Sequence, residues 1–163
     1  MKLYIKQKPF SWRDRFFIKD EYGNDRYYAE GELFSWGRKL HVYLAQEGYE
    51  IAFIRQKVWS FRPRYFIEIN GQTFPIVREF TFFRPRFYLE GVDWAMEGDF
   101  LRHEYTMGDR GGLIMRMSKH WFTWGDSYEL EIFDPRNELL CLTVALAIDC
   151  MNADASNSSG GHH

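Results

Sequence analysis

Up to residue 134 the sequence consists of short runs in which apolar and polar residues alternate. Lys2 to Lys6 places Leu3 and Ile5 on one face, and Arg38 to Leu44 repeats the pattern. Alternation with a period of two is typical of strands that bury one face. Turn-forming sequences separate the runs: Tyr22-Gly23-Asn24, Glu47-Gly48, Asn70-Gly71 and Gly108 to Gly112. The pattern predicts about twelve antiparallel strands, each joined to the next by a short connection.

After Asp134 the alternation stops, and residues 138–151 (ELLCLTVALAIDCM) are almost entirely apolar. From Leu139 to Ile148 only Thr143 is polar. Asp134 suits the N-cap and Pro135 the first helical position, so we expect a helix over residues 138–151. Such a helix spans roughly 21 Å, too short to cross a bilayer, and it must be buried on every side. The alternatives are a single strand or a core helix with one exposed side.

The strands and the helix together predict one architecture. About twelve antiparallel strands leave two unpaired edges unless they close into a barrel, and a barrel of that size is too wide for side chains alone to fill. The apolar helix can fill it. We therefore predict a mainly β fold, a closed antiparallel barrel of about twelve strands around a central C-terminal hydrophobic α-helix. The barrel forms a single domain over residues 1–151. Residues 152–163 (NADASNSSGGHH) are expected to form a disordered polar tail whose final histidines match the remnant of an expression tag.

Composition narrows the possible functions. The 163 residues are 45% hydrophobic and 19% aromatic, and the net charge of −2 does not favour a nucleic-acid partner. The sequence does not open on a signal peptide, so we expect a cytoplasmic protein that can sit peripherally at the membrane. Cys141 and Cys150 fall on opposite faces of the expected helix, too far apart to bridge, and we interpret them as buried free thiols.

No motif of a common enzyme class is present: there is no nucleophile elbow, phosphate-binding loop, dinucleotide fingerprint or Cys-x-x-Cys pair. We therefore expect no catalytic residues, no metal and no cofactor. Asp93, Glu97 and Asp99 share one face of a predicted strand, and we interpret them as a solvated outer face rather than an acid/base or metal group. His41 should also face solvent. Asp149 lies near the expected C-terminus of the helix, where a negative charge is unfavourable, so we expect it to pair with an arginine or a backbone donor.

Basic side chains provide the best candidate for a binding surface. Residues 55–64 contain four cations and no acidic residue, and the Arg-Pro-Arg motif that ends this run recurs at residues 84–86. The six cations together suit a phosphate-bearing ligand such as an anionic lipid headgroup. They are Arg55, Lys57, Arg62, Arg64, Arg84 and Arg86. Trp59 and Phe61, or Phe82 and Phe83, would then be interfacial anchors. The simpler interpretation, which we favour for these side chains, is that the aromatic residues pack on the barrel and the cations are solvated. A nucleic acid would need the same patch and is the less favoured partner.

Four motifs resemble those of a known family. They are Phe10-Ser11-Trp12-Arg13-Asp14; Gly98-Asp99-Phe100 with His103 and Tyr105; Trp121 to Asp126 with Tyr128-Glu129; and Ala145-Leu146-Ala147-Ile148-Asp149. Over residues 1–151 the chain is similar to the LURP-one-related family, whose tubby-like fold is a strand barrel around a C-terminal hydrophobic helix. The resemblance implies that fold.

Two groups of proteins with the same fold suggest a function. Tubby domains bind phosphoinositides through a basic surface, and phospholipid scramblases add a calcium segment and a membrane-inserting tail. Neither scramblase addition is visible in this sequence. We therefore predict a non-enzymatic tubby-like domain that binds anionic lipid headgroups or a similar phosphate-bearing ligand. The alternative is a structural or regulatory protein-interaction domain without a small-molecule ligand.

Overall fold

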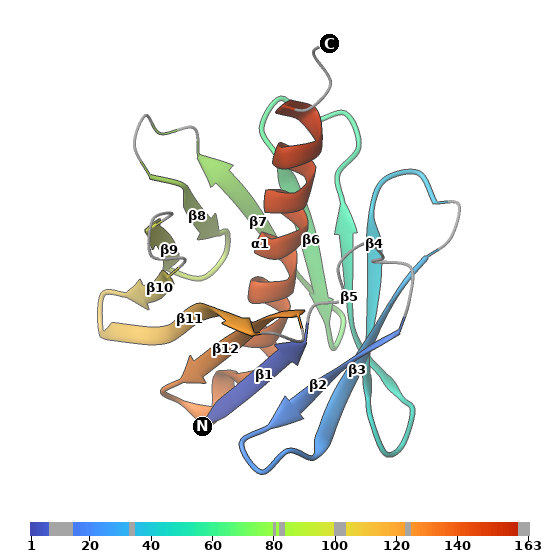
Figure 1. Ribbon diagram of the computed structural model, residues 1–163. Helices are drawn as coiled ribbons and strands as arrows, with labels where there is room; N and C mark the ends of the chain where they lie inside the picture. Colours follow the sequence, from blue (N-terminus) through green and yellow to red (C-terminus); the bar gives the residue numbers. More distant parts are fainter. Residues whose placement is uncertain are drawn as a thin grey trace.

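The fold is a closed barrel of twelve antiparallel strands. The computed structural model describes residues 1–6, 15–32, 35–79, 81, 84–99, 104–122 and 125–159. Each strand pairs with its neighbours in sequence, and β1 pairs with β12 to close the barrel (Figure 1). The strands are β1 (Lys2–Lys6), β2 (Phe16–Asp20), β3 (Asp25–Gly31), β4 (Lys39–Leu44), β5 (Glu50–Gln56), β6 (Arg64–Ile69), β7 (Gln72–Glu79), β8 (Arg86–Leu89), β9 (Trp94–Asp99), β10 (Glu104–Asp109), β11 (Gly112–Phe122) and β12 (Gly125–Ile132). The predicted barrel is confirmed.

The predicted turns all connect paired strands. In the β6–β7 hairpin, Asn70 and Gly71 have φ values of 50° and 75°, as a two-residue turn with both central residues left-handed requires. Side chains then alternate between the two faces of the barrel wall. Leu3 and Ile5 of β1 are buried inside, whereas Lys2 and Lys6 on the same strand are not.

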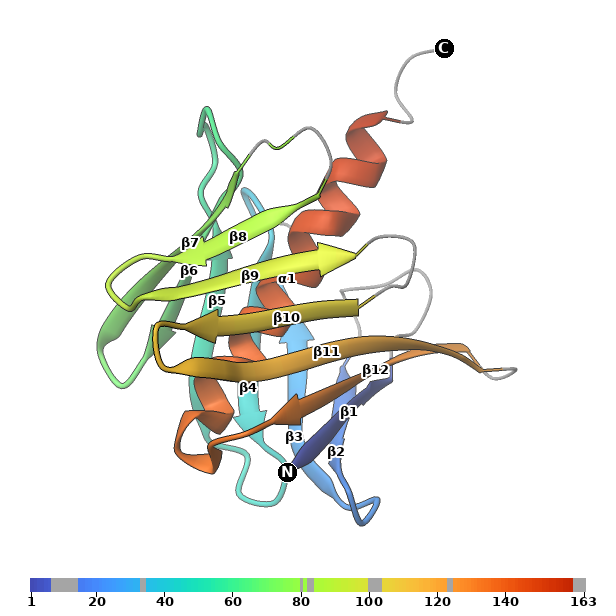
Figure 2. The ribbon, with the colours of Figure 1, turned by 90° about the vertical axis from the view of Figure 1, so that its left-hand side faces the viewer.

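The C-terminal helix fills the barrel. A short 3₁₀ turn, η1 (Pro135–Asn137), leads into α1 (Glu138–Ser159), and the Asp134 carboxylate accepts a hydrogen bond from the Arg136 amide at 3.0 Å. Every residue from 141 to 151 is buried, and strands lie on both sides of α1 in two perpendicular views (Figure 2). The polar Thr143 is accommodated because its hydroxyl donates to the Leu139 and Leu140 carbonyls at 2.9 and 3.0 Å.

The helix is longer than the sequence predicted. It ends at Ser159, so the prediction of a disordered tail is wrong for residues 152–159, and residues 160–163 lie outside the described part of the chain. With 22 residues, α1 is also long and apolar enough to cross a bilayer, so the argument from its length was wrong. Its burial in the barrel accounts for its apolar composition, which is common for the core helix of a protein.

Candidate functional site

The two ends of the barrel differ. At one end lie the tight hairpin turns and the N-terminus of α1, where Glu138 contacts Arg26 and Tyr27. At the other end lie the described parts of the connections β3–β4 (residues 32 and 35–38), β5–β6 (57–63) and β7–β8 (81, 84 and 85), and here the last turns of α1 emerge (Figures 1 and 2). We call these the hairpin end and the loop end.

Large aromatic side chains are exposed at the loop end. The exposed fractions are 81% for Trp36, 90% for Trp59 and 96% for Phe61. Trp59 also has a φ of 63°, in the left-handed region that residues with a Cβ rarely adopt. The loops that carry these side chains adjoin, because a Cβ added to Gly37 would lie 2.7 Å from Cγ2 of Val58. The expectation that Trp59 and Phe61 pack on the barrel was therefore wrong.

Three of the six predicted basic residues lie on the outer wall and have carboxylate partners. Arg55 lies 3.5 Å from Glu68 and over the Phe66 ring, Arg64 lies 3.1 Å from Glu90, and Arg86 lies 3.6 and 3.8 Å from Glu79 and Glu97. These three arginines reach carboxylates on neighbouring strands or turns, because their side chains point away from the barrel core.

The other three predicted basic residues are at the loop end. Lys57 and Arg62 are exposed in the β5–β6 loop, and Arg84 is exposed in the β7–β8 connection. These two connections begin or end side by side, since Arg78, next to the last residue of β7, donates its amide to the carbonyl of Pro63, the last residue of the β5–β6 loop, at 3.1 Å. Within the described residues, none of the three cations forms an ion pair. The predicted set is thus divided by the fold, and Phe82 and Phe83 fall outside the described residues.

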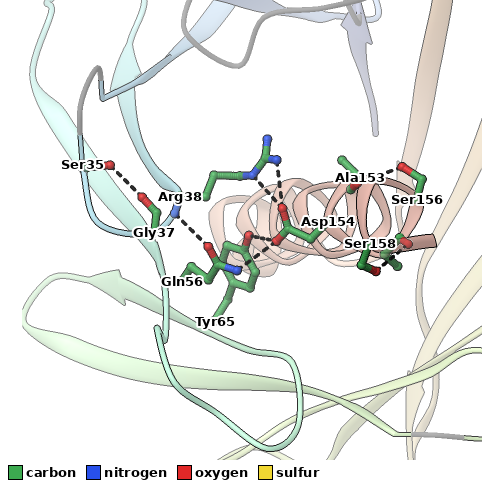
Figure 3. Close-up of polar contacts among 10 residues, drawn as sticks. Ser35, Gly37, Arg38, Gln56, Tyr65, Ala153, Asp154, Ser156 and Ser158 are labelled. Carbon is green, nitrogen blue, oxygen red and sulfur yellow. Dashed lines mark hydrogen bonds and ion pairs between the residues drawn. The ribbon is translucent and has the colours of Figure 1, made fainter. Parts of the chain in front are cut away.

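A polar cluster that the sequence did not reveal joins α1 to the loop end (Figure 3). We call it the Asp154 cluster: Arg38, Gln56, Tyr65 and Asp154. Arg38 donates to Oδ1 of Asp154 from Nε and Nη2 at 3.2 and 2.9 Å. Gln56 Nε2 and the Tyr65 hydroxyl donate to Oδ2 at 3.2 and 2.5 Å. Burial, with contributions from Cys150 and Asp154, raises the pKa of Tyr65 far above its usual range, so the hydroxyl remains a donor.

Two further polar contacts link α1 to the wall of the barrel. The Tyr128 hydroxyl donates to Oδ1 of Asp149 at 2.9 Å, and Asn152 Nδ2 donates to the Tyr105 hydroxyl at 3.3 Å. Asp149 therefore has a partner, as predicted, and the contact described is with a tyrosine. Because α1 continues to Ser159, Asp149 lies in the body of the helix rather than near its C-terminus.

The remaining candidates for chemistry lie on the outer wall. His41 faces outward, with Nδ1 2.6 Å from Glu50 and Nε2 2.8 Å from Glu32. Partial burial lowers the pKa of His41, but hydrogen bonds to the two carboxylates outweigh it and the pKa is raised. Asp93 lies in the turn before β9 and pairs with Arg110 at 2.8 Å, whereas Glu97 is exposed on β9. The Asp99 side chain is outside the described set.

The candidate residues in the described part of the chain do not form a metal site. Among the side chains of that part, no three His, Cys, Asp or Glu gather as a metal ion would require. An open hollow of about 320 Å³ lies beside the Asn70-Gly71 turn, at the hairpin end, and includes Glu50 and Glu68 in its lining. Two carboxylates make this hollow unsuitable for an anion.

A closed antiparallel barrel filled by a C-terminal hydrophobic helix is the tubby-like fold. The chain belongs to the LURP-one-related family, whose model matches residues 1–149. It is 36% identical over 150 residues to the protein YxjI of Bacillus subtilis strain 168, a match that covers 91% of this chain and 92% of that protein. An X-ray structure of a protein from Arabidopsis thaliana shares the fold with a TM-score of 0.60 and 16% identity, and the match covers 93% of this chain and 90% of that one. The resemblance seen in the sequence is confirmed.

Proposed function

We propose that this protein binds membranes containing anionic lipids, with the loop end facing the lipid surface. The observation that carries the proposal is Trp59, a large apolar side chain that is 90% exposed on a left-handed backbone. A left-handed residue with a Cβ costs about 1–2 kcal/mol, and an exposed side chain returns little of that through folding. Strain retained in an exposed position is typical of residues that act on a ligand.

The neighbouring side chains suit a lipid surface better than an apolar partner. Tryptophan and phenylalanine insert at the boundary between headgroups and acyl chains, and cations beside them attract anionic headgroups. Trp59 and Phe61 share the β5–β6 loop with Lys57 and Arg62, and Arg84 is in the adjoining connection. Each cation near an anionic surface contributes about 1 kcal/mol, an attraction that salt weakens.

The distribution of charge supports this orientation. The net charge is −2, so the whole molecule is not attracted to an anionic surface. The three exposed cations Lys57, Arg62 and Arg84 lie at the loop end and form no ion pair within the described residues. An anionic membrane would therefore attract the loop end through these side chains.

Sedimentation with vesicles tests the electrostatic half of the proposal. Phosphatidylcholine vesicles with and without phosphatidylglycerol or a phosphoinositide are compared over a salt series. The double variant Arg62→Gln, Arg84→Gln removes two loop cations and should weaken binding by about 2 kcal/mol, or roughly thirtyfold. The control Arg55→Gln, Arg86→Gln removes the same charge from the outer wall and should bind nearly as wild type does. Equal losses in both variants would contradict the proposed orientation.

Trp59→Ser tests the apolar half. It should weaken vesicle binding at least tenfold, and Tyr22→Ser, which removes an exposed aromatic from a turn at the hairpin end, should not. Insertion is measured separately by quenching of tryptophan fluorescence with brominated lipids. If wild type binds neither kind of vesicle at low salt, the lipid proposal fails and the loop end is left to a protein partner.

A further inference from the structure

The members of the Asp154 cluster are the residues at the bases of the two aromatic loops. Arg38 ends the β3–β4 loop, two residues after Trp36. Gln56 is the last residue of β5, directly before the β5–β6 loop, and Tyr65 follows that loop as the second residue of β6. One carboxylate on α1 thus accepts hydrogen bonds from both loops (Figure 3).

We propose that Asp154 is a positioning residue, which links the last turns of α1 to both loop bases and so fixes Trp36 relative to Trp59 and Phe61. The inference rests on the proposed function in one respect, since it assigns these loops to lipid binding. The link itself is a property of the free protein and is measured without lipid.

Arg38 and Gln56, the two loop-base residues that Asp154 binds, are also hydrogen-bonded to each other. The Gln56 side-chain oxygen accepts from the Arg38 amide at 2.9 Å, and the Gln56 amide donates to the Arg38 carbonyl at 2.8 Å. Gly37 lies directly against Val58, where no Cβ would fit. A movement of Arg38 or Gln56 therefore shifts Trp36 and the start of the β5–β6 loop together.

The carboxylate charge of Asp154 is needed to hold the loop bases together, because the cluster is partly buried and water satisfies its donors only in part. In Asp154→Asn one of the two carboxylate oxygens becomes an NH₂ donor, so either the Arg38 guanidinium or the Tyr65 hydroxyl and the Gln56 side-chain NH₂ would lose an acceptor. Unpaired polar groups in such a position seek water, which separates the loop bases. Residues 152–159 are rich in Asn, Asp and Ser, which favour helix poorly, so this end of α1 would also fray.

The same helix provides a matched control at the hairpin end. There Glu138 is held by Arg26 and by the Tyr27 hydroxyl, which donates at 2.7 Å, as Asp154 is held by an arginine and a tyrosine. The two carboxylates are about 24 Å apart along α1 at 1.5 Å per residue. Glu138→Gln therefore perturbs the same kind of network on the same helix without touching the loop end.

Hydrogen exchange of the lipid-free protein is the first measurement, made well below the melting temperature of each variant. The hydrogen-bonded amides at the loop bases, those of Arg38, Gln56 and Lys57, should exchange at least tenfold faster in Asp154→Asn than in wild type. Glu138→Gln should leave these amides unchanged and speed exchange at the hairpin end instead. Asp154→Glu keeps the charge and should restore most of the protection. Unchanged loop exchange in Asp154→Asn overturns the inference, whatever the lipid result.

Vesicle binding is the second measurement. Asp154→Asn should bind at least threefold more weakly than wild type, with the same slope of binding against salt, because the loop cations are retained. Glu138→Gln should bind as wild type does. If the loops loosen in Asp154→Asn while its vesicle binding equals that of wild type, the role of Asp154 in lipid binding is overturned. If the loops loosen and wild type itself does not bind, the link from Asp154 to the loops is upheld and the proposed function fails.

Discussion

Replacing Leu142 by alanine tests whether the helix is the core of the barrel. Leu142 is fully buried, so truncation removes three carbon atoms from a position with no access to water. The transfer term is about 0.8 kcal/mol per methylene, or about 2.4 kcal/mol, and the cavity left behind adds to it. We expect a loss of about 2–5 kcal/mol in the free energy of unfolding, a large share of the 5–15 kcal/mol typical of a domain.

Urea unfolding followed by tryptophan fluorescence measures this loss, with the slope against urea required to stay constant. Leu113→Ala is the matched control, because it makes the same change at a residue of β11 that is 43% exposed. The control should lose about 1 kcal/mol or less. A loss in Leu142→Ala no greater than that in Leu113→Ala would refute the conclusion that the barrel is built around α1.

Three further predictions concern the wall, the thiols and the loop end. Because the pKa of His41 is raised in the folded protein, its ion pairs stabilise the fold fully below about pH 6.5 and lose this effect as the pH rises through the folded-state pKa. The melting temperature of wild type should therefore fall more than that of His41→Gln between about pH 6 and 9. Burial raises the pKa of Cys141 to about 12 and that of Cys150 well above its usual range, so neither thiol should react with a disulfide reagent until the protein unfolds; fast labelling of the native protein would contradict this. Gly37→Ala should destabilise more than Gly23→Ala, because both residues have positive φ but only Gly37 has a side chain in the way; equal losses of melting temperature would show that Gly37 contributes through φ alone.

The fold was predictable because it follows from local patterns that agree with one another. Alternation in runs such as Lys2–Lys6 fixed which face of a strand is buried, and Asn70-Gly71 fixed a two-residue hairpin. The apolar run from Leu139 to Ile148 required an enclosure, which the strands supply by closing. Each inference needed only neighbours in sequence.

The candidate site was predictable only in part. The spacing of Arg62, Arg64, Arg84 and Arg86 predicted one basic surface, but the fold places Arg64 on the wall beside Glu90 of the β8–β9 turn and Arg86 beside Glu79 of β7. The alternation of side chains along each strand would have shown this. The residue after each of these two arginines is buried, so both arginines must point outward from their strands. Neither alternation nor composition could reveal that Trp59 is exposed, because it lies in a loop, where side chains do not alternate between two faces.

The end of α1 shows why the remaining part of the site was hidden. The composition of residues 152–159 favours disorder, and by local preference alone the helix should stop near Met151. It continues because Asp154 accepts hydrogen bonds from residues 116, 98 and 89 positions away in the chain. Contacts of that separation exist only once the barrel has closed, so the last turns of α1 are a consequence of the barrel rather than of their own sequence. The last turns of α1 are therefore stable only while Arg38, Gln56 and Tyr65 remain in position. The helix end and the two aromatic loops should accordingly become ordered or disordered together.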